Sequence, residues 1–199
     1  MKTDPDLSIV RACQAGSKEE FQRAYEELFQ RYKNKVFNVA FRITGSEADA
    51  ADVAQEAFIV LYKKIQDFRF NSKFSSWLYR IVVNLSIDRR RKNSSKLVMA
   101  SETIDTLQSI DSPELVDRRE AAPETAFGHK EFESYVQSCI NQLSPKFSAI
   151  LILRYIEDLS YKEIGDILGC SIGTVKSRLS RAHKAVEAVL GPNLEKYRA

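Results

Sequence analysis

Cysteine, glycine, proline and histidine are all scarce in this chain of 199 residues, which contains 3, 7, 5 and 2 of them. The cysteines Cys13, Cys139 and Cys170 are an odd number at wide spacing, which excludes a disulfide framework and a CxxC metal pair. No stretch approaches the roughly 20 consecutive apolar residues that a membrane span needs. The first residues lack an apolar segment, so we expect no secretory signal and a reduced, cytoplasmic chain.

Sequence signatures of catalysis are missing too. The chain has no GxGxxG, P-loop, GxSxG or HExxH motif. His129 and His183 are far apart and have no other metal ligand at a suitable spacing. Cys170 could sense redox changes, but a small packed thiol is the favoured interpretation. The sequence therefore predicts no catalytic residue, no metal site and no cofactor, and we expect that the protein is not an enzyme.

The composition is that of a globular protein, with 44% hydrophobic and 29% charged residues, and the length suits one or two domains. Charge is distributed unevenly. Lys and Arg outnumber Asp and Glu by 17 to 12 in residues 1–92 and by 10 to 8 in residues 129–199, but they are outnumbered 3 to 7 in residues 93–128. This distribution favours two basic domains joined by an acidic linker.

Helical periodicity dominates the chain, which predicts an all-α fold of two small helical domains. Residues 1–92 predict a bundle of about four helices, with apolar stripes such as Phe74, Trp77, Leu78 and Ile81. Residues 93–128 have no sustained period and contain Pro113 and Pro123, so they predict a long linker. Residues 129–199 are periodic again.

The sequence of the second domain predicts a helix-turn-helix. Ser160 and Glu163 have the spacing of a capping box at the start of a short helix. Gly169 can end that helix in a left-handed conformation, and Ser171 can cap the next one. That next helix carries one apolar stripe, formed by Val175, Leu179, Ala182 and Val186.

The opposite face of this last helix is basic. The sequence from residue 167 to residue 186 contains no acid, and its polar face presents Lys176, Ser177, Ser180, Arg181 and Lys184, with Arg178 to one side. Arginine can pair with guanine edges, serine with bases or phosphates, and lysine with phosphates. A solvated face or a hairpin used only for packing is the alternative, but the combined pattern favours DNA binding.

Aromatic and basic residues alternate between residues 67 and 80. This composition is typical of proteins that bind single-stranded nucleic acid, because bases stack on aromatic rings while cations follow the backbone. Asn84 follows on a polar face, where an amide can read a flipped base. Phe74 and Trp77 also fit an apolar core stripe, which is the favoured interpretation for these two, whereas Phe68 and Phe70 are expected to be exposed.

Four segments together resemble the extracytoplasmic-function (ECF) sigma factors of bacterial RNA polymerase. They occur in the order and at the spacing of that family and span both predicted domains: Asp49–Phe58, Phe74–Asn84, Leu159–Ile164 and Gly173–Ala182. The resemblance implies that residues 1–92 are sigma region 2, that residues 93–128 are a flexible linker, and that residues 129–199 are sigma region 4.

The resemblance also implies partners for individual residues. Core RNA polymerase would be bound at its β′ clamp helices by Asp49, Asp52, Gln55 and Glu56. The −10 promoter element would be recognised and melted by Lys64, Phe68, Phe70, Lys73, Trp77, Arg80 and Asn84. The −35 element would be read by Lys176, Ser177, Arg178, Ser180, Arg181 and Lys184. The β flap of the polymerase and an anti-sigma factor, which could hold the protein at the inner membrane face, are further expected partners.

Two other functions stay open. A free-standing helix-turn-helix regulator would bind operators without polymerase, and an adaptor or decoy would bind core polymerase without starting transcripts. The acidic segment Asp49–Glu56 and the aromatic segment argue against the regulator. A nucleic-acid enzyme is the weakest alternative, because the chain shows no metal or nucleophile constellation.

Overall fold

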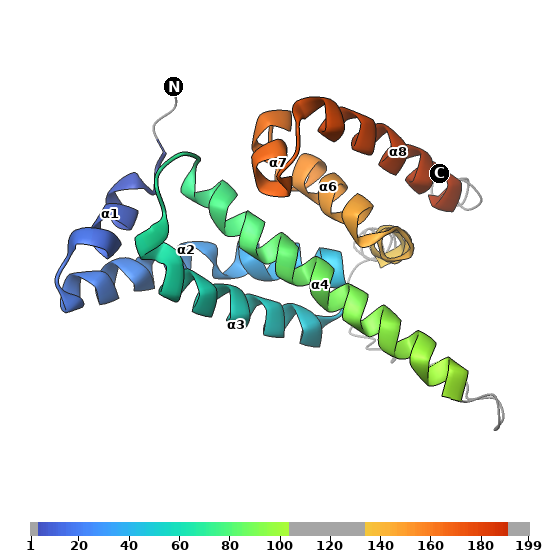
Figure 1. Cartoon of the computed structure of the whole chain (residues 1–199), viewed down its shortest axis with the longest axis horizontal. Helices are drawn as coiled ribbons and strands as arrows, with labels where there is room; N and C mark the ends of the chain where they lie inside the picture. The colour runs from blue at the N-terminus through green and yellow to red at the C-terminus, as the bar shows by residue number, and fades with distance from the viewer. Residues whose placement is uncertain (1–3, 104–133, 191–199) are drawn as a thin grey trace, which may run out of the picture.

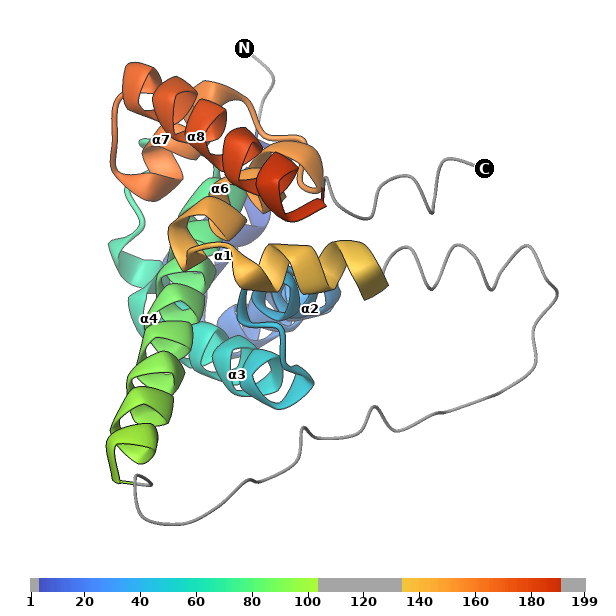
Figure 2. The same cartoon turned by 90° about the vertical axis from the view of Figure 1, so that its right-hand side faces the viewer.

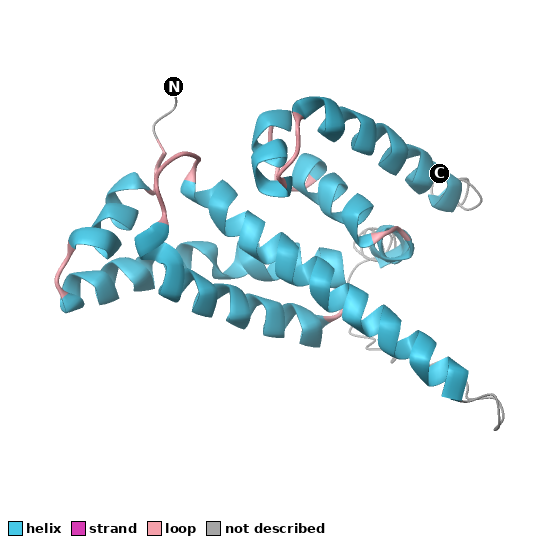
Figure 3. Cartoon of the chain, in the orientation of Figure 1, coloured by secondary structure: helices cyan, strands magenta, loops and turns pink. Residues whose placement is uncertain are grey.

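The computed structural model describes residues 4–103 and 134–190. Figure 3 shows that this part of the chain consists of helices and connecting loops, which confirms the predicted all-α fold. Within it, no helix combines the length and apolarity that crossing a membrane requires. The elements are α1 (Leu7–Ala15), α2 (Lys18–Thr44), α3 (Glu47–Lys64), the 3-10 helix η1 (Ile65–Asp67), α4 (Phe74–Thr103), a helix over 134–142, α6 (Pro145–Tyr155), α7 (Tyr161–Leu168) and α8 (Ile172–Leu190).

The first unit is a bundle of α1 to α4. Its centre is fully buried and contains Leu28 and Val36 of α2, Leu61 of α3 and Phe74 and Leu78 of α4. Because these residues recur at helical spacing, each helix turns one apolar stripe inward. The predicted bundle of about four helices is therefore what the structure contains.

Local signals set the limits of the longest bundle helix. Ser17 and Glu20 form a reciprocal capping box at the start of α2. Gly45 ends α2 with φ of 75°, a left-handed conformation that costs glycine little. Ser46 then caps α3 by accepting a hydrogen bond from the Asp49 amide. A single residue thus separates α2 from the cap of α3, which makes the two helices antiparallel neighbours.

Helix α4 is longer than the sequence analysis expects. It continues to Thr103, so the first residues of the predicted linker are helical. Two polar contacts support this extension, because Asn93 donates to Asp49 at 2.8 Å and Ser94 donates to the carbonyl of Arg90 at 3.0 Å. The rest of the predicted linker, residues 104–128, lies outside the described residues.

The second unit contains the predicted helix-turn-helix. Ser144 caps α6, which has Pro145 in its first turn. Ser160 and Glu163 form the predicted capping box of α7, and Gly169 ends α7 with φ of 62°. Ser171 Oγ then accepts a hydrogen bond from the Thr174 amide at the start of α8. The predicted capping box at Ser160, the glycine end at Gly169 and the cap at Ser171 are confirmed.

The two units pack directly against each other. Helices α6 and α7 lie along α4, and α6 also touches α2 (Figures 1 and 2). The guanidinium of Arg90 on α4 donates to the carbonyls of Ile43, Asn141 and Leu143 and to the hydroxyl of Ser148. Arg90 thus joins the end of α2 to the second unit. No local pattern in the sequence predicts this contact.

Candidate polymerase and nucleic-acid interfaces

The basic face of α8 is exposed because the opposite face of the helix is packed. Val175, Leu179 and Ala182 are buried against α6 and α7. This packing turns five of the predicted DNA-binding side chains toward solvent: Lys176, Ser177, Ser180, Arg181 and Lys184. The sixth, Arg178, is half-buried and donates a long hydrogen bond to Cys170 Sγ at 3.8 Å. Cys170 is thus a partly packed thiol.

Phe68 is buried, which contradicts the prediction that it is exposed. Only 5% of the residue is accessible, and its ring lies 5.0 Å from Phe70, 5.3 Å from Trp77 and 5.9 Å from Phe74. The prediction failed because a loop residue has no period from which its inward face can be read. Phe74 is fully buried, as favoured, while Phe70 and Trp77 are half-buried at the rim of this aromatic cluster.

The polar residues of the predicted −10 surface are exposed at the end of α3, in the loop and along α4. Lys64, Lys73, Arg80 and Asn84 all lie at the surface. Two of these four face the helix-turn-helix. Lys73 Nζ is 2.6 Å from Glu163 Oε1. The Arg80 guanidinium is next to Gly169, which has no side chain; a Cβ atom added there would lie 3.7 Å from Arg80 Nη2. The second unit therefore covers one edge of this surface.

Glu163 combines capping with this contact between the units. Burial raises the pKa of its carboxyl, but hydrogen bonds from Lys73 and Ser160 outweigh burial and hold the pKa at about 2. Tyr79 supplies a second contact, because its hydroxyl donates to Glu157. Burial and this hydrogen bond raise the pKa of Tyr79. Both contacts are made through carboxylates, and they join α4 and the loop before it to the second unit.

The four predicted polymerase-binding residues of α3 lie in two environments. Asp49 and Asp52 face α4, where Arg89 Nη1 is 3.7 Å and 3.0 Å from their carboxylates. Gln55 and Glu56 are exposed, one turn further along the helix. Asp52 nevertheless remains exposed, as Gln55 and Glu56 are, whereas Asp49 is half-buried and also a structural bridge to α4.

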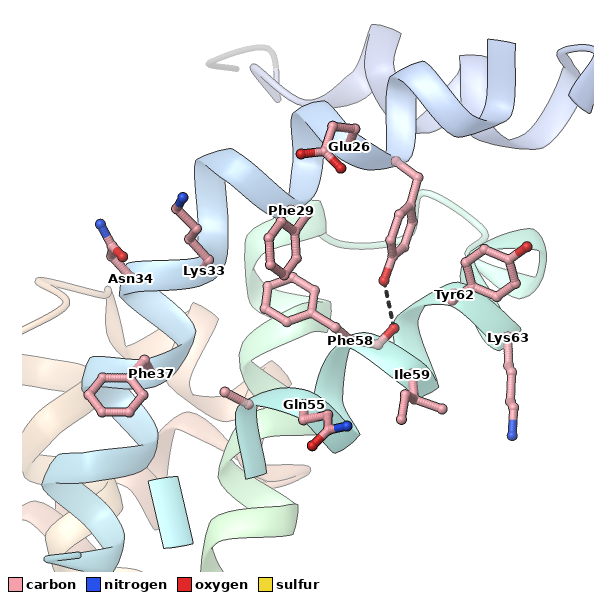
Figure 4. A pocket seen from close by; sticks show the side chains of 12 residues that line it. Glu26, Phe29, Lys33, Asn34, Phe37, Gln55, Phe58, Ile59, Tyr62 and Lys63 are labelled. Carbon is pink, nitrogen blue, oxygen red and sulfur yellow. Dashed lines mark hydrogen bonds between the residues drawn. The ribbon is translucent and has the colours of Figure 1, made fainter. Parts of the chain in front are cut away.

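An apolar groove of about 760 Å³ lies between α2 and α3 (Figure 4). Phe29 of α2 and Phe58 of α3 meet at its floor with ring centroids 4.7 Å apart, and the Tyr25 hydroxyl donates to the carbonyl of Phe58 at 2.8 Å. Ile59 and Tyr62 remain 46% and 56% exposed at its rim. The groove is not among the predicted sites, although both rim residues lie outside the buried stripe of α3 and are apolar or aromatic.

Two family models match this chain. The model described as Sigma-70 region 2 matches residues 28–96, and the model described as Sigma-70, region 4 matches residues 133–186. The ECF RNA polymerase sigma factor SigW of Bacillus subtilis is 37% identical over 85% of this chain and 90% of its own length. The chain belongs to the ECF RNA polymerase sigma factor family.

Solved structures agree with this sigma factor in fold. CnrH, solved in complex with the cytosolic domain of CnrY, has a TM-score of 0.66 at 21% identity over 96% of this chain and 99% of that one. The sigma factor RpoE of Bartonella quintana, solved with the anti-sigma factor NepR, has a TM-score of 0.61 at 22% identity over 85% of this chain and 98% of that one.

The region 4 unit of the sigma factor has an apolar groove of its own, of about 530 Å³. It is lined by residues from the helix over 134–142, from α6 and from the end of α8, and Tyr155 and Ile156 are 60% and 48% exposed at its edge. His183 Nε2 lies 2.8 Å from the Tyr155 hydroxyl across this groove. The groove lies beside the basic face of α8, so one small unit presents an apolar surface and a cationic surface.

Proposed function

We propose that this sigma factor binds core RNA polymerase and directs it to specific promoters by reading the −35 element and melting the −10 element. The observation that carries the proposal is the exposed basic face of α8, which follows a capped α7 and a left-handed glycine turn. A positive helix face with exposed arginine, lysine and serine suits the major groove of DNA.

Contacts to the −35 element would divide by chemistry. Arg181 is exposed near the middle of α8 and can form paired hydrogen bonds with guanine. Lys176 and Lys184 would neutralise phosphates, which adds affinity without sequence information. Arg178 is half-buried beside Cys170, so a contact to the DNA backbone suits it better than a base contact.

The −10 element would be opened at the loop and the first turns of α4. Unstacking a base costs a few kcal/mol, and a pocket that stacks and hydrogen-bonds the flipped base offsets that cost. Phe70 and Trp77 are half-buried and so can offer ring surface, while Phe68 supports them from beneath. Asn84 is exposed on α4 and supplies hydrogen-bonding groups for a base.

Core polymerase would be bound through both apolar grooves. The groove between α2 and α3, with Gln55 and Glu56 beside it, suits the β′ clamp helices, because helices bind grooves through a few apolar side chains. The groove of region 4 suits the tip of the β flap. Asp52 could exchange its ion pair with Arg89 for a basic residue of the polymerase.

Simultaneous reading of both elements requires the two units to separate. The −35 and −10 elements are centred about 25 base pairs apart, which corresponds to about 85 Å of B-form DNA. In this structure α7 instead packs on α4, and Lys73 pairs with Glu163. We infer that binding to core polymerase opens the protein, and that the protein alone binds promoter DNA poorly.

An anti-sigma factor is the expected regulator. One of the similar solved structures is a sigma factor bound to the anti-sigma factor NepR. A partner of this kind would keep the protein inactive in the cytoplasm, or at the inner face of the membrane if the partner is itself membrane-bound. Full activity in unstressed cells would contradict this part of the proposal.

A mobility-shift experiment with and without core polymerase distinguishes the proposed function from its alternatives. The proposal predicts a specific shift of promoter DNA only when core polymerase is present, together with permanganate-reactive thymines in the −10 region. A shift by the protein alone would favour a free-standing regulator. Binding to core polymerase without open complexes would favour an adaptor or decoy.

A further inference from the structure

The loop between η1 and α4 has an unusual backbone. It carries three predicted −10 residues, Phe68, Phe70 and Lys73. Phe70 has φ of 57°, a left-handed conformation that is uncommon for a bulky residue. Such a conformation persists only where the surrounding structure holds it in place. The contacts that hold this loop therefore matter for the function proposed above.

One amide side chain of α1 holds the beginning of the loop. Gln14 Nε2 donates to the carbonyls of Ile65 and Phe68, both at 2.8 Å. The contact is reciprocal, because Gln66 Nε2 donates back to the carbonyl of Cys13 at 2.7 Å. Three side-chain hydrogen bonds thus connect the end of α1 to the turn that precedes Phe70.

The start of the same N-terminal segment holds the other end of the loop. Asp4 Oδ2 accepts a hydrogen bond from the Phe74 amide at 2.7 Å, which satisfies a backbone donor at the start of α4. Between these two anchors, the Arg11 guanidinium lies 5.7 Å from the centroid of the Phe70 ring. The segment Asp4–Gly16 therefore contacts the beginning, the middle and the end of the loop.

The N-terminal segment is itself fixed to the bundle, so it can position the loop. Asp6 is only 1% exposed, and it accepts hydrogen bonds from the Tyr32 hydroxyl and from Arg31 Nη1. Val10 and Cys13 are also buried in the core. A segment held this firmly transmits its position to the loop, because packed cores do not deform continuously.

We propose that the segment Asp4–Gly16 is a clamp that sets the conformation of the loop between η1 and α4, with Gln14 as its main positioning residue. The segment lies before residue 28, where the match to sigma region 2 begins. Its proposed role rests on the function proposed above, because the loop matters only if it binds the −10 element. The clamp would act on base capture and not on attachment to core polymerase.

The test substitutes Gln14 in the full-length protein. Gln14→Glu keeps the length of the side chain but replaces the donor with an acceptor beside two carbonyls, whereas Gln14→Lys restores donors. Gln22→Glu is the matched control, because Gln22 is exposed on α2. Arg11→Leu is a second variant that removes only the exposed cation over Phe70 and spares the core.

Three measurements separate positioning from general destabilisation. Trp77 is the single tryptophan, and its ring lies 5.3 Å from Phe68, so its fluorescence and acrylamide quenching report the loop in the free protein. The second measurement is the affinity of the holoenzyme for a labelled single-stranded −10 oligonucleotide from a promoter that it transcribes. The third is the affinity for core polymerase.

Gln14→Glu is expected to change the quenching of Trp77 and to weaken oligonucleotide binding about tenfold, as loss of two hydrogen bonds implies. Affinity for core polymerase should stay within about twofold. Gln14→Lys should restore most of the wild-type Trp77 quenching and oligonucleotide binding. Arg11→Leu should weaken oligonucleotide binding less than Gln14→Glu does, and Gln22→Glu should behave as wild type.

Several results would overturn the clamp. Unchanged Trp77 quenching and oligonucleotide binding in Gln14→Glu and Arg11→Leu would do so. Equal loss of oligonucleotide binding and of core affinity in Gln14→Glu and Gln14→Lys, with no effect of Arg11→Leu, would show a merely structural role. If the wild-type holoenzyme does not bind the −10 oligonucleotide, the proposed function fails. Trp77 quenching in the free protein still decides whether the segment positions the loop.

Discussion

Replacing Arg90 with methionine is expected to release the region 4 unit from the region 2 bundle. Methionine keeps much of the aliphatic volume but removes every donor. Three of the four acceptors of Arg90 belong to the second unit: the carbonyls of Asn141 and Leu143 and the hydroxyl of Ser148. Burial lowers the pKa of Arg90, so the guanidinium is partly desolvated in this contact.

The size of the effect follows from these three contacts. A hydrogen bond within a protein contributes about 0.5–1.5 kcal/mol net, so their loss weakens the contact between the units by about 1.5–4.5 kcal/mol. That loss lowers the ratio of closed to open protein by a factor of about 10 to about 1,600. Two other contacts between the units remain, Tyr79 with Glu157 and Lys73 with Glu163. We therefore expect the population of the open state to rise while each unit keeps its fold.

Small-angle scattering and core-binding titrations measure the outcome. Arg90→Met should increase the radius of gyration while the helical circular dichroism stays unchanged. Its affinity for core polymerase should rise, because the binding-competent fraction of the free protein is larger. Lys92→Met, an exposed change two residues further along α4, is the control. A variant as compact as wild type, with the same core affinity, would refute the claim that Arg90 holds the two units together.

Three further predictions concern the promoter surfaces and pH. Arg181→Ala should lower discrimination at one −35 position by about 1–3 kcal/mol, and an equal loss on promoters with altered −35 sequences would contradict a base contact. Asn84→Ala should reduce permanganate reactivity in the −10 region without weakening core binding, so unchanged reactivity would argue against it. The pKa of Glu163 is held at about 2, below its usual 4.5. The stability that its ionised carboxylate adds to the contact between the units is therefore present above pH 4.5 and is lost as pH falls through 2. Scattering at decreasing pH should show that Glu163→Gln is less compact at neutral pH and lacks this transition; an identical pH profile would exclude the Lys73 pair as a contact between the units.

The helix-turn-helix could be predicted from sequence because its signals are local. A capping box at Ser160, a glycine at position 169 and a cap at Ser171 each act within a few residues of the chain. The buried stripe of α8 follows from helical spacing alone, and it places the exposed face by elimination. For the same reason the favoured core position of Phe74 is confirmed.

Features that depend on long-range packing could not be predicted in this way. The burial of Phe68 depends on rings contributed by α4, and no periodicity runs through the loop that carries it. The contacts of Arg90 join residues about 50 positions apart, and the four consecutive cations Arg89–Lys92 have the composition of a solvated helix face. The groove between α2 and α3 forms only when the two helices pack, although exposed Ile59 is a trace of it.

Run-off transcription of fragmented genomic DNA by core RNA polymerase, with and without this protein, tests the central claim most directly. The account predicts new, discrete start sites that share −35 and −10 motifs and that disappear when the protein is omitted. A protein that binds core polymerase but produces no new start sites would contradict the account.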